Sequence, residues 1–113
     1  MREEQLLIYL KTSCAGRKSR VSSTELEQVL HIRQTDLRKL VNRLRRKGNP
    51  ICSDRNGYFY AITAGEVYTT IRQLREMENG LRAAIGGLEQ SMNLFREQQE
   101  NDHGEADFSV GRR

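Results

Sequence analysis

The hydrophobic residues of the first thirty positions are spaced as on two short amphipathic helices. The first covers residues 2–12, and its apolar face holds Leu6, Leu7 and Leu10. Gly16 opens a polar, basic loop after it, in which Val21 is expected to form a strand of one or two residues. A second helix begins at Ser22, because Ser22-Ser23-Thr24-Glu25 matches a capping box. Its buried face is expected to hold Leu26, Val29 and Leu30.

The third predicted helix covers residues 34–47 and ends at Gly48, a residue typical of helix C-termini. One side is apolar and carries Leu37, Leu40, Val41 and Leu44. At about 100° per residue, the opposite side carries Thr35, Arg38, Lys39, Asn42 and Arg46. Arg43 and Arg45 flank the apolar side, and Asp36 is the only acid. The helix is therefore half core and half cationic surface.

Strand-forming residues follow at 51–53 and 58–62, after an extended exit at Asn49-Pro50. Asn56-Gly57 lies between them and is a strong hairpin signal, because both residues tolerate positive φ. With Asn56-Gly57 as the loop, Arg55 sits at the tip of the hairpin. One face is then expected to cover the helices with Ile51, Ser53, Tyr58, Tyr60 and Ile62.

The hydrophobic period changes after a second capping box, Thr63-Ala64-Gly65-Glu66. Apolar residues then alternate at spacings of four and three, interrupted only by Glu78: Val67, Ile71, Leu74, Leu81, Ile85, Leu88, Met92 and Phe95. Ile at position a and Leu at position d favour a two-stranded parallel coiled coil. Gly80 and Gly86-Gly87 leave open a kinked helix, two shorter helices, or a helix folded back onto the domain. These patterns predict a domain at 1–62, a coiled-coil helix at 63–96 and a disordered tail at 97–113.

The charge is divided unevenly along the chain, whose net charge is +4. Thirteen basic residues face six acidic ones through Ile62, a surplus of seven; beyond it six arginines face nine acids, a deficit of three. A basic half joined to an acidic half indicates two tasks, with contact to a polyanion assigned to the first.

Several classes of function find no support in the residues. No apolar run approaches the roughly 18 residues of a membrane span, and the start of the chain does not read as an export signal. Cys14 and Cys52 are read as reduced thiols of a cytoplasmic protein. We find no metal-ligand spacing around His31 and His103, no phosphate loop and no catalytic constellation. No enzyme activity, cofactor, metal or small-molecule ligand is therefore expected.

The order of helix, short strand, helix, turn, helix and hairpin resembles the winged helix-turn-helix fold. The resemblance is carried by Leu26, the turn at residues 31–33, and Leu37, Val41 and Leu44, which fall where such domains place their core. Residues 48–51 followed by Gly57-Tyr58-Phe59-Tyr60-Ala61 are similar to the wing of the biotin-repressor type. The resemblance to the winged helix-turn-helix fold covers roughly residues 2–62. It implies a mainly α (α+β) fold of three helices and a hairpin wing, here followed by a long dimerisation helix. No biotin ligase domain follows, so that activity is not implied.

In such a fold the third helix enters the DNA major groove. The resemblance therefore implies base contacts from Gln34, Thr35, Arg38, Lys39 and Asn42. Arg can bind guanine and Asn or Gln can bind adenine through paired hydrogen bonds. Contacts to phosphates or the minor groove are expected from Arg17, Lys18, Arg20, Arg33, Arg45, Arg46 and Arg55.

These observations predict a small homodimeric bacterial or phage transcriptional regulator that binds double-stranded DNA. Helix 34–47 would occupy the major groove, hairpin 51–62 would act as the wing, and the heptad residues would join two copies. The alternative is a winged-helix adaptor, for example in phage replication or assembly, whose third helix binds an acidic protein without reading DNA sequence.

Overall fold

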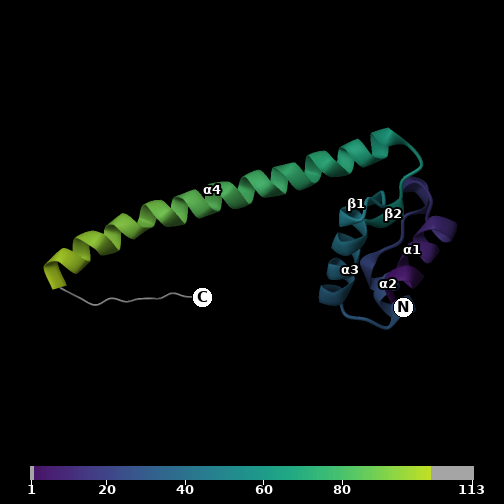
Figure 1. The fold of residues 1–113 in the computed structure, drawn as a ribbon, viewed down its shortest axis with the longest axis horizontal. Coiled ribbons are helices and arrows are strands. Elements are labelled where there is room, and N and C mark those ends of the chain that lie inside the picture. The colour runs from purple at the N-terminus through teal and green to yellow at the C-terminus, as the bar shows by residue number, and fades with distance from the viewer. Residues whose placement is uncertain (1, 103–113) are drawn as a thin grey trace. The chain divides into compact units, whose positions relative to one another are not determined.

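The computed structural model describes residues 2–102, with side chains described through Arg96. The elements, labelled in Figure 1, are α1 (Arg2–Ser13), the 3₁₀ turn η1 (Arg17–Ser19), α2 (Ser23–Leu30), α3 (Gln34–Arg46), β1 (Ile51–Asp54), β2 (Gly57–Tyr60) and α4 (Ala64–Asp102). The predicted mainly helical fold with one hairpin and a long C-terminal helix is confirmed.

The chain divides into two compact units, Met1–Leu74 and Arg75–Arg113, which we describe separately. The first unit takes in the opening turns of α4, beyond the predicted boundary at residue 62. The segment 97–113, predicted to be disordered, overlaps the end of α4 at residues 97–102, and its remainder lies outside the described residues.

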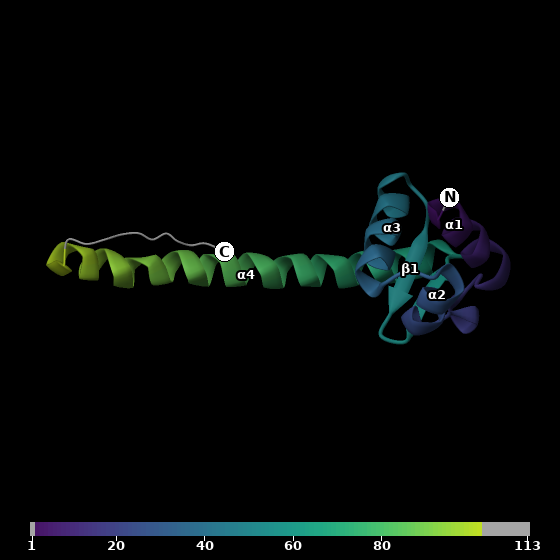
Figure 2. The ribbon, with the colours of Figure 1, turned by 90° about the horizontal axis from the view of Figure 1, so that it is seen from below.

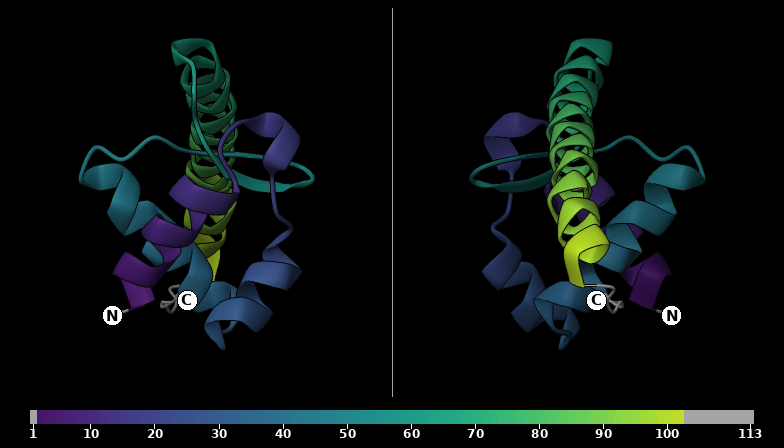
Figure 3. Two further views of the ribbon diagram at one scale, coloured as in Figure 1. Left: turned by 90° about the vertical axis from the view of Figure 1, so that its right-hand side faces the viewer. Right: turned by 90° about the vertical axis from the view of Figure 1, so that its left-hand side faces the viewer.

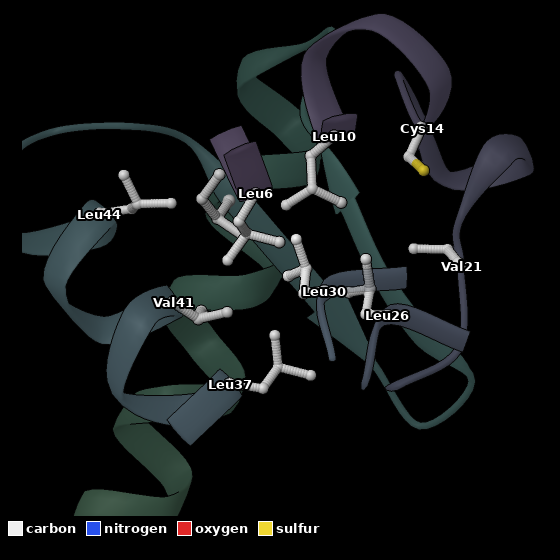
Figure 4. Close-up of a cluster of buried hydrophobic side chains, with 10 residues drawn as sticks. Leu6, Leu10, Cys14, Val21, Leu26, Leu30, Leu37, Val41 and Leu44 are labelled. Atoms are coloured by element: carbon white, nitrogen blue, oxygen red, sulfur yellow. The ribbon is translucent and has the colours of Figure 1, made fainter. Parts of the chain in front are cut away.

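The core of the first unit is formed where the apolar faces of α1, α2 and α3 meet. Figure 4 shows these side chains pointing toward one another: Leu6, Leu10, Leu26, Leu30, Leu37, Val41 and Leu44. Leu7 and Leu40 are partly buried and pack against this cluster. The prediction for Val29 was wrong, since its side chain is 44% exposed. α2 has only eight residues, and Leu26 and Leu30 occupy the face that it turns toward the core, so Val29 lies to one side of that face.

Local signals set the bounds of α2 and α3. The Ser22 hydroxyl accepts a hydrogen bond from the Glu25 N–H at 3.1 Å, as the capping box predicts. His31 ends α2 in the left-handed region, with φ of 56°, where Gly is the usual residue. The Ile32 N–H then bonds to the Glu27 carbonyl at 3.1 Å. A turn of three residues, 31–33, therefore joins α2 to α3.

The hairpin turn lies one residue earlier than predicted, which shifts the pairing of the two strands by two residues. Asp54 pairs with Gly57, so the turn is Arg55-Asn56 and not Asn56-Gly57. The reason is a close approach of backbones: a Cβ atom on Gly57 would lie 2.1 Å from the Val21 carbonyl oxygen. Gly57 is needed inside the strand, and the turn is instead closed by the Asn56 N–H donating to the Asp54 carboxylate at 2.8 Å. Ile62, predicted to share the buried face, lies beyond β2 and is 67% exposed.

Val21 supplies the short strand that the sequence predicts, beside β2. Its N–H donates to the Tyr58 carbonyl at 2.9 Å, and its carbonyl accepts from the Tyr58 N–H at 2.8 Å. Two further bonds tie the preceding loop to the other end of β2, from Gly16 N–H to the Tyr60 carbonyl and from Tyr60 N–H to the Cys14 carbonyl. The loop that contains η1 is thus fixed along β2, beside which it lies in Figure 3.

Both faces of the hairpin are covered, whereas the sequence predicted one. Ile51, Tyr58 and Tyr60 pack on the helical core. Cys52 and Phe59 alternate with them and are also buried. On β1, the Ser53 N–H donates to the Thr70 hydroxyl at 3.3 Å, and Thr70 is itself buried. The opening turns of α4 therefore belong to the packing of the hairpin.

α4 is one continuous helix from Ala64 to Asp102 (Figure 2). It begins as its capping box predicts, with the Thr63 hydroxyl accepting from the Glu66 N–H at 3.1 Å. The helix passes through Gly80 and Gly86-Gly87 without interruption, so the alternative of two separate helices was wrong. Among the described residues, no helix has the length and apolar character required to span a membrane.

Candidate nucleic-acid interface

The outward face of α3 is polar and largely cationic. Burial of Leu37, Val41 and Leu44 fixes the rotation of the helix about its axis. That rotation exposes six residues singled out in the sequence: Gln34, Thr35, Arg38, Lys39, Asn42 and Arg46. We call these six residues the α3 face. Hydrogen-bond donors and acceptors therefore lie beside positive charge on one exposed surface.

The cations of this face are free of partners within the described side chains. Arg38, Lys39 and Arg46 make no ion pair or side-chain hydrogen bond there, and the same holds for Arg33, which precedes α3. Asp36, the acid on this helix, forms no ion pair with Lys39 three residues on. Unpaired cations on one helix raise the local positive potential, which attracts polyanions.

Arg45, predicted to contact phosphate, instead fastens α3 to the hairpin. Its Nε donates to the Ile51 carbonyl at 2.8 Å, and its Nη2 donates to the Ser53 hydroxyl at 3.1 Å. Burial lowers the pKa of the Arg45 guanidinium, and the nearby Tyr58 opposes this shift. Arg45 flanks the apolar side of the helix in the sequence, and this position could have indicated a structural role.

Arg43 and Lys47 are held by the carboxylate of Glu3, near the start of α1. Arg43 Nη1 lies 3.4 Å from Glu3 Oε1, and Lys47 Nζ bonds to Glu3 Oε2. The hydrogen bond from Lys47 is the main cause of a lowered pKa at Glu3. Exposed pairs of this kind add little stability, but they join α1 to the end of α3 and neutralise part of its charge.

A second basic group gathers beside the hairpin turn. Arg20 Nη1 lies 3.7 Å from Asp54 Oδ2, and Arg17 Nε lies 4.0 Å from the same oxygen. Lys18 is exposed on the loop, and Arg55 is exposed in the turn directly after Asp54. We call Arg17, Lys18, Arg20 and Arg55 the turn cluster. The sequence named these four cations, and the structure brings the two segments that carry them together.

Glu66 holds the backbone beneath the turn cluster, a role the sequence did not indicate. Its Oε2 accepts from the Arg17 N–H at 3.1 Å, and its Oε1 accepts from the Ile62 N–H at 2.8 Å. Both backbone hydrogen bonds lower the pKa of the Glu66 carboxyl, and the bond from Ile62 has the larger effect. A capping-box Glu is expected to reach back to its own N-cap; here it reaches one residue further and also across to η1.

The residues predicted to join two copies are exposed along most of α4. Leu81, Ile85, Leu88, Met92 and Phe95 are each 55–68% exposed, and Ile71 and Leu74 are 38% and 39% exposed. Val67 differs from the rest, because it is half-buried in the first unit close to the buried Thr70. Val67 is therefore less available to a partner than the sequence suggested.

Features of an enzyme or metal site are sparse in the described part of the chain. No cluster of three or more His, Cys, Asp or Glu residues there could hold a metal ion. A shallow open depression is lined by Arg2, Gln5, Tyr9, Val29, Leu30 and His31. Cys14 and Cys52 are free and buried, and burial raises the pKa of both thiols.

Comparisons with known proteins add no identification: no protein-family model, no curated protein and no solved structure matches this chain.

Proposed function

We propose that this protein binds double-stranded DNA through a winged helix-turn-helix domain. Support comes from the order of the elements: α1, the Val21 strand, α2, a turn of three residues, α3 and the β1–β2 hairpin. Val21 pairs antiparallel with β2, so the hairpin carries a third short strand. In domains of this type the second helix of the helix-turn-helix lies in the major groove. That helix is α3, and the hairpin is the wing.

The observation that carries the proposal is the exposed, unpaired set of cations and amides on α3. Arg38 can donate two bonds to guanine, and Gln34 or Asn42 can bond to adenine in the same bidentate way. Thr35 and Lys39 complete the set of base-reading candidates. All of them are exposed residues of the α3 face: Thr35, Lys39 and Asn42 lie opposite the buried Leu37 and Val41. Gln34 is exposed as the first residue of the helix and lies on the same side as Val41.

Phosphate contacts are assigned to the cations outside that base-reading set. Arg33 and Arg46 flank it along α3, and the turn cluster adds Arg17, Lys18, Arg20 and Arg55. Contacts with phosphate position a protein on DNA without specifying sequence. Arg55, in the two-residue turn of the wing, is the candidate for the minor groove.

We further propose that two copies associate through α4, so that the protein acts as a homodimeric transcriptional regulator of bacterial or phage type in the cytoplasm. The support is the exposed apolar repeat of α4. A dimer that carries two reading helices binds two half-sites, with a spacing set by the dimer.

Fluorescence anisotropy with random-sequence duplex DNA at rising salt tests DNA binding. Affinity should fall steeply with salt, because each neutralised phosphate releases about 0.9 counterion. The double substitution Arg38→Glu with Lys39→Glu should abolish binding. Its matched control is Arg72→Glu with Arg96→Glu, which changes the net charge equally at two exposed positions of α4. Absence of binding by the unchanged protein at low salt would refute the proposal, and equal loss in both variants would show a response to net charge alone.

A second candidate function has its own supporting observation, because the cationic surface already binds carboxylates. Glu3 holds Arg43 and Lys47, and Asp54 faces Arg17 and Arg20. An acidic protein could occupy the remaining cations, as in an adaptor that does not read DNA. The same pair of substitutions discriminates: in an adaptor, charge reversal on α3 abolishes capture of the partner, while the unchanged protein gives no DNA-dependent signal.

A further inference from the structure

The positions of the exposed apolar residues of α4 also indicate the direction in which two copies would pair. In a coiled-coil numbering, Ile71, Glu78, Ile85 and Met92 take position a, and Leu74, Leu81, Leu88 and Phe95 take position d. We propose that this segment pairs with the same segment of a second copy running in the opposite direction, with Ile71 facing the partner's Phe95. The inference rests on the proposed homodimer and assigns its arrangement.

Glu78 argues against the parallel arrangement. In a parallel pair each a residue faces its own copy, so two Glu78 carboxylates would meet in one layer between the layers of Leu74 and Leu81. Like charges brought together in an apolar layer are unfavourable and act against that pairing. The preference of Ile at a and Leu at d for parallel dimers has limited support here, because Ile71 and Ile85 are the only β-branched residues at the four a positions.

In the antiparallel arrangement each a residue faces a d residue of the partner. With Ile71 opposite Phe95, the remaining layers pair Leu74 with Met92, Glu78 with Leu88, and Leu81 with Ile85. All eight positions then find a partner, and the half-buried Val67 is not required. The two Glu78 side chains stand about ten residues apart along the axis, or about 15 Å.

Glu78 also has a counter-ion that suits this position. Arg82 Nη2 lies 3.4 Å from Glu78 Oε2 one turn further along the same helix. Both side chains are largely exposed in the single chain. The carboxylate of Glu78 can thus turn toward Arg82 at the edge of the interface, while its methylene groups cover the partner's Leu88.

The charges that flank the apolar repeat favour the same arrangement. In a parallel pair, residues at e face residues at g of the partner; Arg82 would face Met77, and Glu89 would face Ala84, so no ion pair forms across the interface. In the antiparallel register, e positions face e positions. Glu89 then lies near Arg75 and Arg82 of the partner, twice by symmetry. The two copies of Arg82 meet at the symmetry axis, each between its own Glu78 and the partner's Glu89, which offset the like charges. Complementary charge of this kind fixes direction and register more than affinity.

Cysteine cross-linking in the full-length chain tests the arrangement without using DNA. Leu74→Cys and Met92→Cys are made separately and co-expressed with tags of different size. The antiparallel register places residue 74 against residue 92 of the partner, so the mixed disulfide should form at least tenfold faster than either like pair. Two copies of residue 92 stand about 18 residues apart along the axis, or about 27 Å, beyond the reach of a disulfide. The unchanged chain is the control, because Cys14 and Cys52 are buried.

A second pair, Ile71→Cys with Phe95→Cys, repeats the test at the ends of the segment. The proposal is overturned if Met92→Cys forms a disulfide with itself while the mixed pair does not, because that result is the signature of a parallel coil. It is also overturned if no pair cross-links and the mass in solution is that of a monomer. Either outcome is independent of the anisotropy measurement, so a failure here leaves the DNA-binding proposal to its own test.

Discussion

The two units use apolar residues at similar helical spacing and leave them in opposite environments. In the described part of the chain, every buried hydrophobic residue lies before residue 60, and the apolar repeat beyond Arg75 is exposed. The difference follows from the number of elements available. In the first unit three helices and a hairpin cover one another, whereas the described part of the second unit is one helix. A regular apolar repeat therefore indicates a need for a partner, and the surrounding elements decide whether the chain itself supplies it.

The largest contrast is expected between two leucines, one from each unit. Leu37 is fully buried in the core and Leu88 is 68% exposed. Leu37→Ala should lower the free energy of unfolding by about 2–5 kcal/mol, through reduced burial and a cavity. Leu88→Ala should leave the stability of the first unit unchanged and weaken self-association. Urea unfolding followed by near-UV circular dichroism gives the first quantity, and sedimentation equilibrium gives the second. Equal destabilisation of the first unit by both substitutions would remove the contrast between the units.

Substitution of Gly57 is expected to have the next largest effect, and it tests the close approach of β2 to Val21. A methyl group there would lie 2.1 Å from the Val21 carbonyl oxygen, which belongs to the backbone and cannot rotate away. Gly57→Ala should therefore cost about 1–3 kcal/mol in strain, or the Val21 strand should separate from β2. Gly80→Ala is the matched control, because nothing lies within 4 Å of a Cβ atom at Gly80. That control should stabilise its helix by about 1 kcal/mol or less. Thermal unfolding compares them, and a harmless Gly57→Ala would contradict the close approach.

Substitutions at two neighbouring arginines of α3 should have different effects: one on the stability of the fold and the other on DNA binding. Arg45→Met keeps the aliphatic stem but removes both bonds to β1, so it should cost about 1–3 kcal/mol. It should leave the salt dependence of DNA binding unchanged. Arg46→Met should behave in the opposite way, with unchanged stability and a salt slope reduced by about 0.9 for each phosphate that is no longer neutralised. If Arg45→Met alone lowered the salt slope, the assignment of Arg45 to the fold would be wrong.

The smallest effect expected is a dependence on pH from Glu66. Its pKa is lowered from the usual 4.5 by bonds from Ile62 and Arg17. A lowered folded-state pKa contributes stability that is present above pH 4.5 and is lost as the pH falls through the folded value. Glu66→Gln removes that contribution, so the variant should be slightly less stable than the unchanged protein at pH 7, and the difference should disappear as the pH falls below 4.5. Denaturant unfolding between pH 3 and pH 7 measures this difference, and parallel curves would exclude a role for Glu66.

Features that depend on neighbours in the sequence were predicted well. The Ser22 capping box, the Val21 strand and the apolar sides of α1 and α3 each follow from a few adjacent residues, and the structure shows all of them. The exposed α3 face follows from the same helical spacing once Leu37 and Val41 are placed in the core.

Features that depend on distant partners were not predicted. Gly57 was assigned to the turn because Asn-Gly favours turns, and its contact with Val21 is not visible in the sequence. Arg45 and Glu66 find their partners on other parts of the chain, so Arg45 was assigned to phosphate contacts and Glu66 only to a capping box. The second covered face of the hairpin was missed because Thr70 lies in a segment whose spacing resembles a coiled coil.

The loop that carries Arg17 and Arg20 is held at three points before any ligand arrives. Gly16 and Val21 bond to β2 on either side of it, and Glu66 accepts from the Arg17 N–H. A loop ordered in advance gives up little backbone entropy when a phosphate binds. Calorimetry should therefore find no large entropic penalty, and little heat-capacity change, assignable to ordering of this loop. The arginine side chains would exchange Asp54 for phosphate while the main chain beneath them stays in place.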